Sequence, residues 1–451
     1  MKKLTINEII KACAGTFYGD EKLLESPVCG IETDSRELKP GYLFIPIQGE
    51  RFDGHDFIEK AYDSGALITL SEKDIEGYPY IKVKSTFKAL KDIAEYYRGL
   101  FDVKVVAVTG SVGKTTTKEM IYSVLSQKYC VLKSQKNYNN EIGVPLTLFN
   151  LSGEHDIAVI EMGMNHFGEI RRLSKTARPD ICVITNIGHS HVGYLESRDG
   201  IFKAKSEIFE YIKPGGTAVL NGDDDMLSTV KSGGFDTVFY GYEKDNDAQI
   251  TKFEPQGFSG SSCELSYNGA AFDFEIKMPG AHMAYAAAAA YCIGKKLGID
   301  DARIRAGIAE FKPVGNRMEV IDTQNITILN DVYNASPESV KAAIEVLMMA
   351  KGRKVCVLGD MFELGDMSDK LHAEIGMYAA ECGADIMLCA GDASKNTAEA
   401  ARENGLDAHW FKTKEEMAQS FAQYIKKGDT VLVKASRGMH FEQAVEALKN
   451  I

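Results

Sequence analysis

The chain has 451 residues, more than one ordinary hydrophobic core organises, so about three domains are expected. Charged residues make up 26% of it and hydrophobic residues 45%, a balance typical of globular proteins that excludes a disordered or fibrous chain. The net charge of -12 argues against a general nucleic-acid binder.

The cysteine pattern and the hydropathy of the chain indicate in which compartment the protein works. The nine cysteines are scattered and form no C-x-x-C pair, so a reduced cytosolic protein without a thiolate zinc site is expected. No stretch approaches the roughly 20 apolar residues of a membrane span. Asn7, Glu8 and Lys11 interrupt any signal-peptide run. We therefore expect a cytoplasmic protein that binds neither a membrane nor nucleic acid.

Residues 1–100 are predicted to form a small α/β domain that ends in a helix over 88–100. Polar loops over 33–36 and 49–57 join short apolar strands such as 42–47. Ser35 and Arg36 stand side by side in the first loop. Such loops usually only turn the chain, but an arginine beside a small hydroxyl also suits a diphosphate.

An apolar run over 105–108 leads into a glycine-rich turn and then a helix. This stretch reads Thr109, Gly110, Ser111, Val112, Gly113, Lys114, Thr115, Thr116 and Thr117. Glycines let backbone N–H groups approach phosphate oxygens, and a helix N-terminus adds partial positive charge. The match is partial, because Val108 stands where the strict pattern has glycine. It still predicts a nucleotide site in which Lys114 reaches the terminal phosphates and the Thr115 hydroxyl binds Mg²⁺.

Alternating strands and helices predict a mostly parallel central sheet. The expected elements are strands over 156–161, 180–185 and 216–220, an antiparallel ribbon over 249–278, and helices over 281–296 and 301–311. Ligands gather at the carboxyl ends of such strands.

Four charged or titratable side chains follow these strands. Glu161 ends the first of them, where an acid suits Mg²⁺ or, alternatively, caps a helix. His189 and His191 follow the second strand and can supply a metal ligand, although one histidine of such a pair is more often simply exposed to solvent. Lys205 lies in a helix predicted over 202–209, where a lysine normally faces solvent. The acidic stretch over 221–225 is predicted to be a loop rather than a metal site.

A break over 313–316 marks the predicted start of a third domain. Its expected elements are strands over 326–331, 354–359, 385–390 and 430–434 and helices over 337–351, 368–382, 394–404, 414–425 and 440–449. This pattern predicts a second doubly wound unit without a phosphate loop of its own. Two α/β units beside one nucleotide site suggest a cleft that closes.

Over essentially its whole length the chain resembles the Mur ligases, ATP-dependent enzymes that build the peptide of the cell-wall precursor. The phosphate loop is common to all of them and to folylpolyglutamate synthetases. The stretches 52–57, 139–145, 330–337, 357–365 and 433–439 are similar to the subfamily that joins D-alanyl-D-alanine to UDP-N-acetylmuramoyl-tripeptide. The resemblance implies an α/β protein of three domains: a UDP-sugar domain over 1–100, a central P-loop ATPase domain with a parallel sheet over 101–314, and a C-terminal Rossmann-like, doubly wound ligase domain over 315–451. A monomer is expected, with the oligomeric state left open by the sequence.

The resemblance also implies the roles of individual residues. ATP would lie on the phosphate loop over 109–116, with Arg317 at its phosphates and Asp331 at its ribose. Two Mg²⁺ ions would lie on Thr115, Glu161, His191 and Lys205. His191 rather than His189 is the implied ligand, and Lys205 would be carbamoylated, which turns a cation into a carboxylate-like group. The residues implied on the substrate side are Ser35, Arg36 and Asn140 for the UDP-sugar-peptide and Ser436 and Arg437 for the dipeptide. Those implied in catalysis are Lys114, Lys205, His191 and Arg317.

Three positions depart from the family pattern. Ala286 stands where the family has an asparagine that touches adenine, Ser336 where asparagine is common, and Ala435 where glycine is common. Two alternative functions stay open. One is a sister ligase that adds a single amino acid or glutamate. The other is a nucleotide-dependent switch, although the sequence holds no Asn-Lys-x-Asp guanine motif and a switch would not need the third domain.

Overall fold

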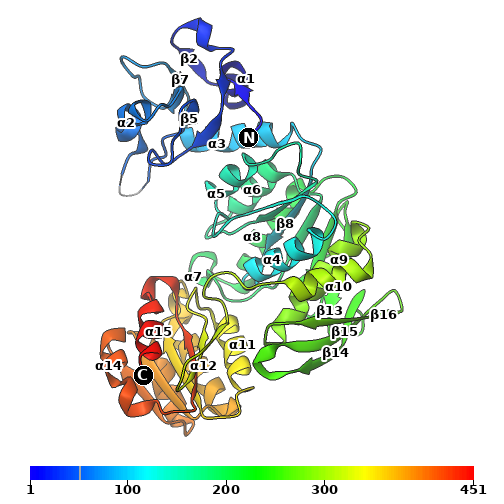
Figure 1. Cartoon of the computed structure of the whole chain (residues 1–451), viewed down its shortest axis with the longest axis vertical. Helices are drawn as coiled ribbons and strands as arrows, with labels where there is room; N and C mark the ends of the chain where they lie inside the picture. Colours follow the sequence, from blue (N-terminus) through cyan, green and yellow to red (C-terminus); the bar gives the residue numbers. More distant parts are fainter. Residues whose placement is uncertain (50–51) are drawn as a thin grey trace.

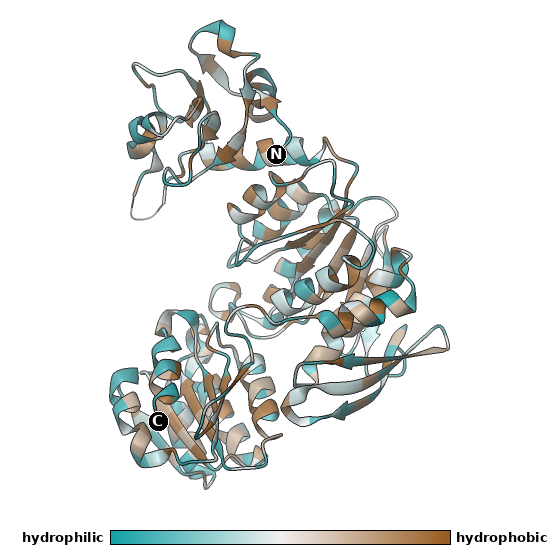
Figure 2. Ribbon diagram, in the orientation of Figure 1, coloured by the Kyte–Doolittle hydropathy of each residue, from teal (hydrophilic) through white to brown (hydrophobic). Residues whose placement is uncertain are grey.

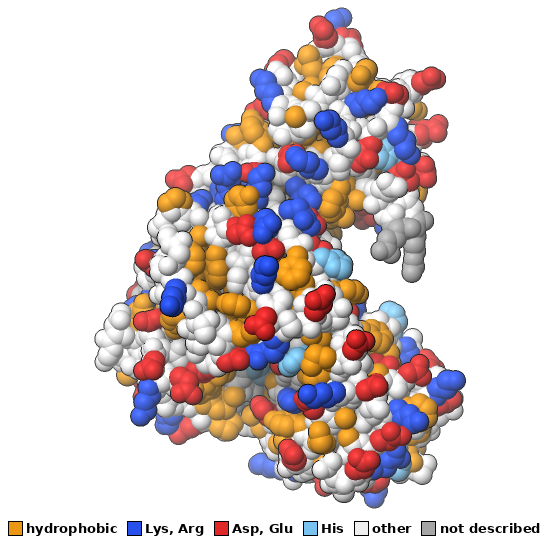
Figure 3. All heavy atoms as spheres, turned by 180° about the vertical axis from the view of Figure 1, so that it is seen from behind, with side chains coloured by type: hydrophobic (Ala, Val, Ile, Leu, Met, Phe, Trp, Pro, Cys, Tyr) orange, Lys and Arg blue, Asp and Glu red, His pale blue; other side chains and the backbone are white. Residues whose placement is uncertain are grey.

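The computed structural model describes residues 1–49 and 52–451, so positions 50 and 51 of the loop predicted over 49–57 lie outside the described residues. Figure 1 shows three α/β regions arranged along an arc, with the N-terminal region at one end, the β8 region in the middle and the C-terminus at the other end. From behind, the outline is hollowed between the two end regions, and acidic and basic side chains are interspersed over this face (Figure 3). Within the described residues, every helix is too short or too polar to cross a membrane.

The N-terminal region is built on a five-stranded sheet of order β2-β7-β6-β5-β4, in which only β2 and β7 pair antiparallel. The strands are β2 (Thr16–Tyr18), β4 (Gly30–Glu32), β5 (Tyr42–Phe44), β6 (Ile68–Ser71) and β7 (Tyr80–Lys82), with β1 (Leu4–Thr5) and β3 (Pro27–Val28) as a separate pair. The helices are α1 (Ile6–Cys13), α2 (Ile58–Asp63) and α3 (Thr86–Arg98). The helix predicted over 88–100 is confirmed as α3. The strand predicted over 42–47 ends at Phe44, close to Pro46, which has no N–H for a ladder.

The middle region holds a nine-stranded sheet of order β16-β15-β14-β13-β12-β11-β8-β10-β9. Its strands are β8 (Lys104–Thr109), β9 (Val131–Lys133), β10 (Ile157–Glu161), β11 (Ile181–Ile184), β12 (Thr217–Asn221), β13 (Asp236–Gly241), β14 (Ala248–Pro255), β15 (Ser261–Tyr267) and β16 (Ala270–Ile276). Its helices are α4 (Lys114–Leu125), α5 (Gly143–Leu148), α6 (Glu169–Ala177), α7 (Val192–Leu195), α8 (Arg198–Ser206), α9 (His282–Lys296) and α10 (Asp301–Glu310). The strands up to β14 pair in parallel, and β14 to β16 form the predicted antiparallel ribbon.

The C-terminal region is a six-stranded sheet of order β17-β18-β22-β19-β20-β21, parallel except for β17. Its strands are β17 (Glu319–Asp322), β18 (Thr327–Asn330), β19 (Lys354–Gly359), β20 (Ile386–Ala390), β21 (Ala408–Phe411) and β22 (Thr430–Lys434). Its helices are α11 (Pro337–Leu347), α12 (Ser368–Cys382), α13 (Ser394–Glu403), α14 (Lys414–Tyr424) and α15 (Glu442–Lys449). Every element predicted for this region is present, and the sequence missed only the two edge strands β17 and β21.

The apolar runs that predicted strands lie in the interior of the sheets. Figure 2 shows hydrophobic residues concentrated on the strands and hydrophilic ones on the outer helix faces. Val105, Val106 and Val108 of β8 are fully buried, because helices cover both faces of a parallel sheet. Because β8 lies between β11 and β10, its carboxyl end, where the glycine-rich turn begins, has a neighbouring strand on each side.

Candidate active site

The glycine-rich turn connects β8 directly to α4, as the sequence predicts. Gly113 precedes α4 with φ of 83°, and Gly110 has φ of 147°, values that side-chain-bearing residues rarely adopt. A Cβ at Gly110 would lie 1.9 Å from the Thr185 hydroxyl oxygen. The turn can therefore take this shape only with glycine at position 110.

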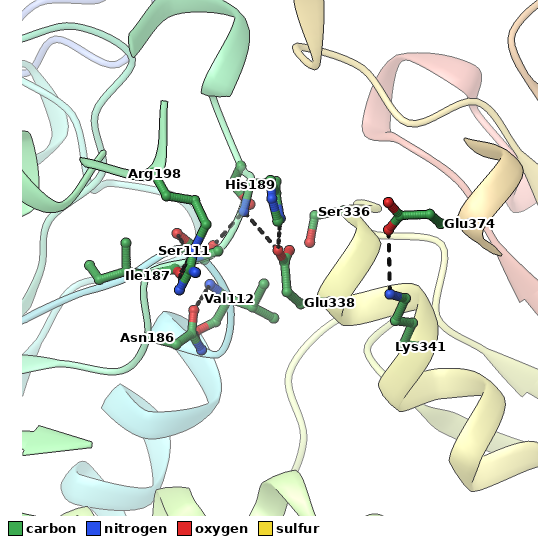
Figure 4. Close-up of polar contacts among 12 residues, drawn as sticks. Ser111, Val112, Asn186, Ile187, His189, Arg198, Ser336, Glu338, Lys341 and Glu374 are labelled. Carbon is green, nitrogen blue, oxygen red and sulfur yellow. Dashed lines mark hydrogen bonds and ion pairs between the residues drawn. The ribbon is translucent and has the colours of Figure 1, made fainter. Parts of the chain in front are cut away.

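The turn is held against the segment that follows β11. The Ser111 and Val112 amides donate to the backbone and side-chain oxygens of Asn186, at 3.0 and 2.9 Å. In return, the Gly188 amide donates to the Ser111 hydroxyl at 2.9 Å. Figure 4 shows these contacts around Asn186. The position of the phosphate loop thus depends on residues 186–188.

Two lysines point at one carbonyl oxygen of this turn. Lys114 Nζ lies 2.8 Å and Lys205 Nζ 3.0 Å from the Gly110 oxygen. The protein packed around the Lys114 ammonium lowers its pKa, although the side chain keeps some exposure to the pocket. Burial, with the Lys114 charge nearby, lowers the pKa of Lys205 well below its usual range. The prediction that Lys205 faces solvent was wrong, since the residue is 1% exposed in the structure.

Glu161 and Thr115 meet at the carboxyl ends of β10 and β8. Thr115 Oγ1 donates to Glu161 Oε2 at 2.8 Å, Asn139 Nδ2 donates to Oε1 at 2.9 Å, and Lys118 Nζ lies 3.5 Å from Oε2. Side chains contact this carboxylate, which is 2% exposed, so the helix-capping alternative for Glu161 is wrong.

A hydroxyl and a carboxylate are oxygen donors of the kind that Mg²⁺ takes, usually together with substrate phosphates. No cluster of three His, Cys, Asp or Glu side chains suited to a metal occurs among residues 1–49 and 52–451. The donor set therefore fits a Mg²⁺ ion shared with nucleotide phosphates rather than one held by protein alone. The acidic stretch over 221–225 is the predicted loop, in which Asp224 accepts backbone N–H groups of Ile187, Met226 and Leu227.

Both histidines after β11 contact carboxylates from the C-terminal region. His191 Nδ1 lies 2.6 Å from Glu363 Oε2, and His189 Nδ1 lies 2.6 Å from Glu338 Oε1. Burial lowers the pKa of His191. The sequence did not single out either acid, although Glu363 lies inside the stretch 357–365 that carries the resemblance. Their partners are more than 140 residues away in the chain, so only the tertiary structure brings them together.

A pocket of about 700 Å³ opens above the phosphate loop. The loop residues that line it are Ser111, Val112, Gly113, Lys114, Thr115, Thr116 and Thr117, and Thr109 and Gly110 do not line it. Residues of the C-terminal region that complete the wall are Arg317, Asp331, Tyr333 and Lys434. Asn140, Glu161, His191 and Ala286 line it as well. The structure thus brings eleven of the predicted site residues to one cavity between two sheets.

An aromatic ring positions two arginines beside this pocket. Arg317 Cζ lies 3.6 Å and Arg437 Cζ 5.3 Å from the centre of the Tyr333 ring. Asp331 pairs with the buried Lys434 and accepts the Met318 amide at 3.1 Å. Stacking on a ring leaves the edge of a guanidinium free for anionic oxygens. Arg317 can therefore face phosphate without giving up the stacked contact.

A smaller pocket of about 220 Å³ adjoins the first and shares Lys114 and His191 with it. Ser436 and Arg437 line it together with Phe362 and Glu363. The Ser436 hydroxyl accepts the Phe362 amide at 2.8 Å, which fixes the loop around it. The predicted dipeptide residues therefore lie next to the predicted nucleotide site.

The remaining predicted residues lie elsewhere or have structural partners. Ser35 is buried, and Arg36 pairs with Asp34 at 2.6 Å, an interaction that lowers the pKa of Asp34 to about 2. Neither lines the two pockets. Asn140 accepts the Gly143 amide at 2.8 Å, at the start of α5.

Two of the departures from the family pattern have local explanations. Ser336 is the N-terminal cap of α11. Ala435 is buried opposite Gly359. A Cβ at Gly359 would lie 2.7 Å from the Ala435 methyl group, so the glycine leaves the room that this methyl group occupies. The structure offers no such explanation for Ala286.

Comparison with known proteins agrees with this geometry. Family models match residues 108–294 (Mur ligase middle domain), 316–437 (Mur ligase, glutamate ligase domain) and 27–98 (Mur ligase family, catalytic domain). The UDP-N-acetylmuramoyl-tripeptide--D-alanyl-D-alanine ligase of Bacillus subtilis is 38% identical over 458 residues, covering 99% of each chain. This chain is a Mur ligase.

Other relatives of this Mur ligase extend along its full length. The ligase of the same name from Escherichia coli is 35% identical, with 100% of this chain and 99% of the relative covered. A crystal structure of MurF from Acinetobacter baumannii matches with a TM-score of 0.94 at 31% identity and 100% coverage of both chains. The MurF ligase of Thermotoga maritima in complex with ADP matches with a TM-score of 0.85 at 30% identity, covering 94% of this chain and 97% of that one. The three-domain α/β fold predicted for the Mur ligase is confirmed.

Proposed function

We propose that this Mur ligase joins D-alanyl-D-alanine to UDP-N-acetylmuramoyl-tripeptide in an ATP-dependent, ADP-forming reaction. The observation that carries the proposal is the phosphate loop, with the Thr115–Glu161 pair beside it, in a chain that is 38% identical over 99% of its length to a ligase of that name. The proposed assignment of domains follows the three sheets: UDP-sugar over 1–100, ATP over 101–314 and the ligase domain over 315–451.

The chemistry requires a poor electrophile to be activated. A peptide carboxylate resists attack by an amine, so its oxygen first takes the γ-phosphoryl group of ATP and ADP leaves. The dipeptide amine then attacks the carbonyl carbon of the acyl phosphate, loses a proton and releases inorganic phosphate. Lys114 and Arg317, which both line the larger pocket, offset the negative charge that gathers on the phosphates.

Thr115 and Glu161 are proposed to hold Mg²⁺ together with the phosphates, and His191 and Lys205 to complete the site for a second ion. Bound Mg²⁺ supplies charge neutralisation at the phosphoryl group. Lys205 is proposed to be carbamoylated. Its lowered pKa supports this, because only the neutral amine adds to the carbon of CO₂, losing a proton as the N–C bond forms.

The remaining residues are proposed to bind the two substrates that are joined. Ser436 and Arg437 line the smaller pocket, next to Lys114, where the dipeptide amine would approach an acyl phosphate. Asn140 lies in the wall of the larger pocket. Arg36 and Ser35 are proposed for the UDP end, where Arg36 would exchange Asp34 for a diphosphate. We also propose that the protein works as a monomer in the cytoplasm.

The test is phosphate release from ATP and Mg²⁺ with UDP-linked muramoyl tripeptide, comparing D-alanyl-D-alanine with single amino acids and glutamate. Release that requires D-alanyl-D-alanine and equals new amide formed is the expected result. Phosphate release with a single amino acid would show that the protein is a sister ligase. Release without any acceptor dependence would overturn the proposed reaction.

A further inference from the structure

The segment that follows β11, residues 186–193, touches two regions of the molecule at once. We refer to it as the histidine loop. Its first residues hold the phosphate loop through the Asn186 and Gly188 contacts described above. Its two histidines face Glu338 and Glu363, which both belong to the C-terminal region. The loop is therefore a physical link between the nucleotide site and that region.

Glu338 makes the closest contacts of this link. Its Oε1 accepts the His189 amide at 2.7 Å and lies 2.6 Å from His189 Nδ1, as Figure 4 shows. Its other oxygen is buried and has no hydrogen-bond partner. A Cβ on Gly188 would lie 2.5 Å from the Glu338 carboxyl carbon, so the acid packs directly on the loop backbone. Burial raises the pKa of Glu338, but hydrogen bonds from His189 and from its own backbone outweigh it, so the pKa lies below its usual value.

A second contact joins the same two regions. The Gly193 amide donates to the Glu363 carbonyl at 3.0 Å. A Cβ on Gly365 would lie 2.8 Å from the Gly193 Cα, so the two backbones touch where neither residue has a side chain. The histidine loop is thus held from the C-terminal region at both ends, at Gly188–His189 and at Gly193.

We propose that Glu338 is a positioning residue that couples docking of the C-terminal region to nucleotide binding through the histidine loop. The proposal rests on the proposed function, because it takes the phosphate loop as the nucleotide site. When the C-terminal region is docked, Glu338 fixes His189, and residues 186–188 hold the phosphate loop in its shape by accepting the Ser111 and Val112 amides and donating to the Ser111 hydroxyl. Because such coupling is reciprocal, a nucleotide on the loop also favours the docked arrangement.

A purely structural role for Glu338 predicts something different. It is the second residue of α11, and an acid in the first turn of a helix stabilises that helix by its charge alone. In that case its removal lowers the melting temperature but leaves the affinity for nucleotide unchanged. The neighbouring helix α12 supplies a matched control. Lys341 lies 3.7 Å from Glu374 of α12, an ion pair that stays inside the C-terminal region (Figure 4).

The experiment compares Glu338→Ala, Glu338→Gln and the control Glu374→Gln in the full-length protein. Calorimetry measures the affinity for ADP with Mg²⁺, and small-angle X-ray scattering measures the radius of gyration with and without ADP. We expect Glu338→Ala to weaken ADP binding by about 5- to 150-fold, the usual range of such coupling, and to reduce the change in radius that ADP causes. Glu338→Gln keeps an oxygen for the His189 amide, so it should recover part of the loss.

A double-mutant cycle completes the test. If the coupling runs through His189, then His189→Ala and Glu338→Ala together weaken ADP binding no more than either alone. Glu374→Gln should bind ADP like the wild type. ADP affinity within about two-fold of the wild type in folded Glu338→Ala, or in Glu338→Gln if the alanine variant does not fold, overturns the proposal. ADP binding needs no acceptor, so a failure of the phosphate-release test would refute the proposed reaction and leave this result standing.

Discussion

Lys114→Ala should greatly slow amide formation while leaving the stability of the fold nearly unchanged. Lys114 lines the pocket above the phosphate loop, and its Nζ donates to the carbonyl oxygens of Gly110 and Ser111, at 2.8 and 3.2 Å. An ammonium about 4 Å from one phosphate charge gains about 4 kcal/mol at an effective dielectric constant of 20. If that interaction is made fully only in the transition state, its loss slows amide formation about a thousand-fold.

The same substitution should barely affect folding. The two hydrogen bonds of the charged ammonium are each worth about 1.5 to 3 kcal/mol, but burial, which lowers the pKa of Lys114, opposes them. We therefore expect a melting temperature within a few degrees of the wild type.

The assay is amide formation at saturating substrates, alongside thermal unfolding. Lys203→Ala, which removes an exposed lysine of α8, is the matched control and should keep full activity. Near-normal amide formation by folded Lys114→Ala would refute the assignment of the phosphate loop.

Three further predictions follow from the site and its support. Lys205→Ala should be inactive but partly rescued by added short-chain carboxylic acids, and full activity without rescue would contradict the carbamoylated lysine. Gly110→Ala should abolish ADP binding measured by calorimetry, because its Cβ would meet the Thr185 hydroxyl at 1.9 Å. Buried His372 accepts the Met361 amide at 3.0 Å through Nε2, which requires the neutral ring, and burial lowers its pKa. The folded state then binds fewer protons than the unfolded state, so this contribution to stability is present above the ordinary pKa of 6.5 and is lost as the pH falls through the lower, folded value. Denaturant unfolding from pH 7.5 to 5 should show this loss, which a His372→Gln variant should lack.

Much of the fold could be predicted because buried parallel strands leave a clear pattern. A strand covered by helices on both faces is a nearly continuous apolar run, interrupted only at its ends, as in β8, β10 and β19. The edge strands β17 and β21 are only four residues long, and β17 has no fully buried residue and β21 has one, so they lack that pattern and were missed. Their existence depends on the neighbouring strand, which the local sequence does not encode.

The residues of the site also divide into those that the local sequence predicts and those that it does not. The phosphate loop could be read from the sequence because a strand, a glycine turn and a helix start are local features with fixed backbone requirements. Glu161 was found for a similar reason, since it ends a buried strand. Helix amphipathicity alone predicted that Lys205 faces solvent. This prediction was wrong because the carbonyl oxygen that Lys205 contacts lies 95 residues earlier in the chain, beyond the reach of a local pattern.

The acids that hold the histidine loop show what only the tertiary structure decided. Glu338 and Glu363 lie in a different sheet region from His189 and His191. Nothing in the spacing of these residues predicts contacts of 2.6 Å, because they arise from the docking of two separately folded sheets. The sequence by itself determined the strands, the helices and the phosphate loop, since each depends on near neighbours. How the C-terminal region meets that loop was decided by packing between distant surfaces.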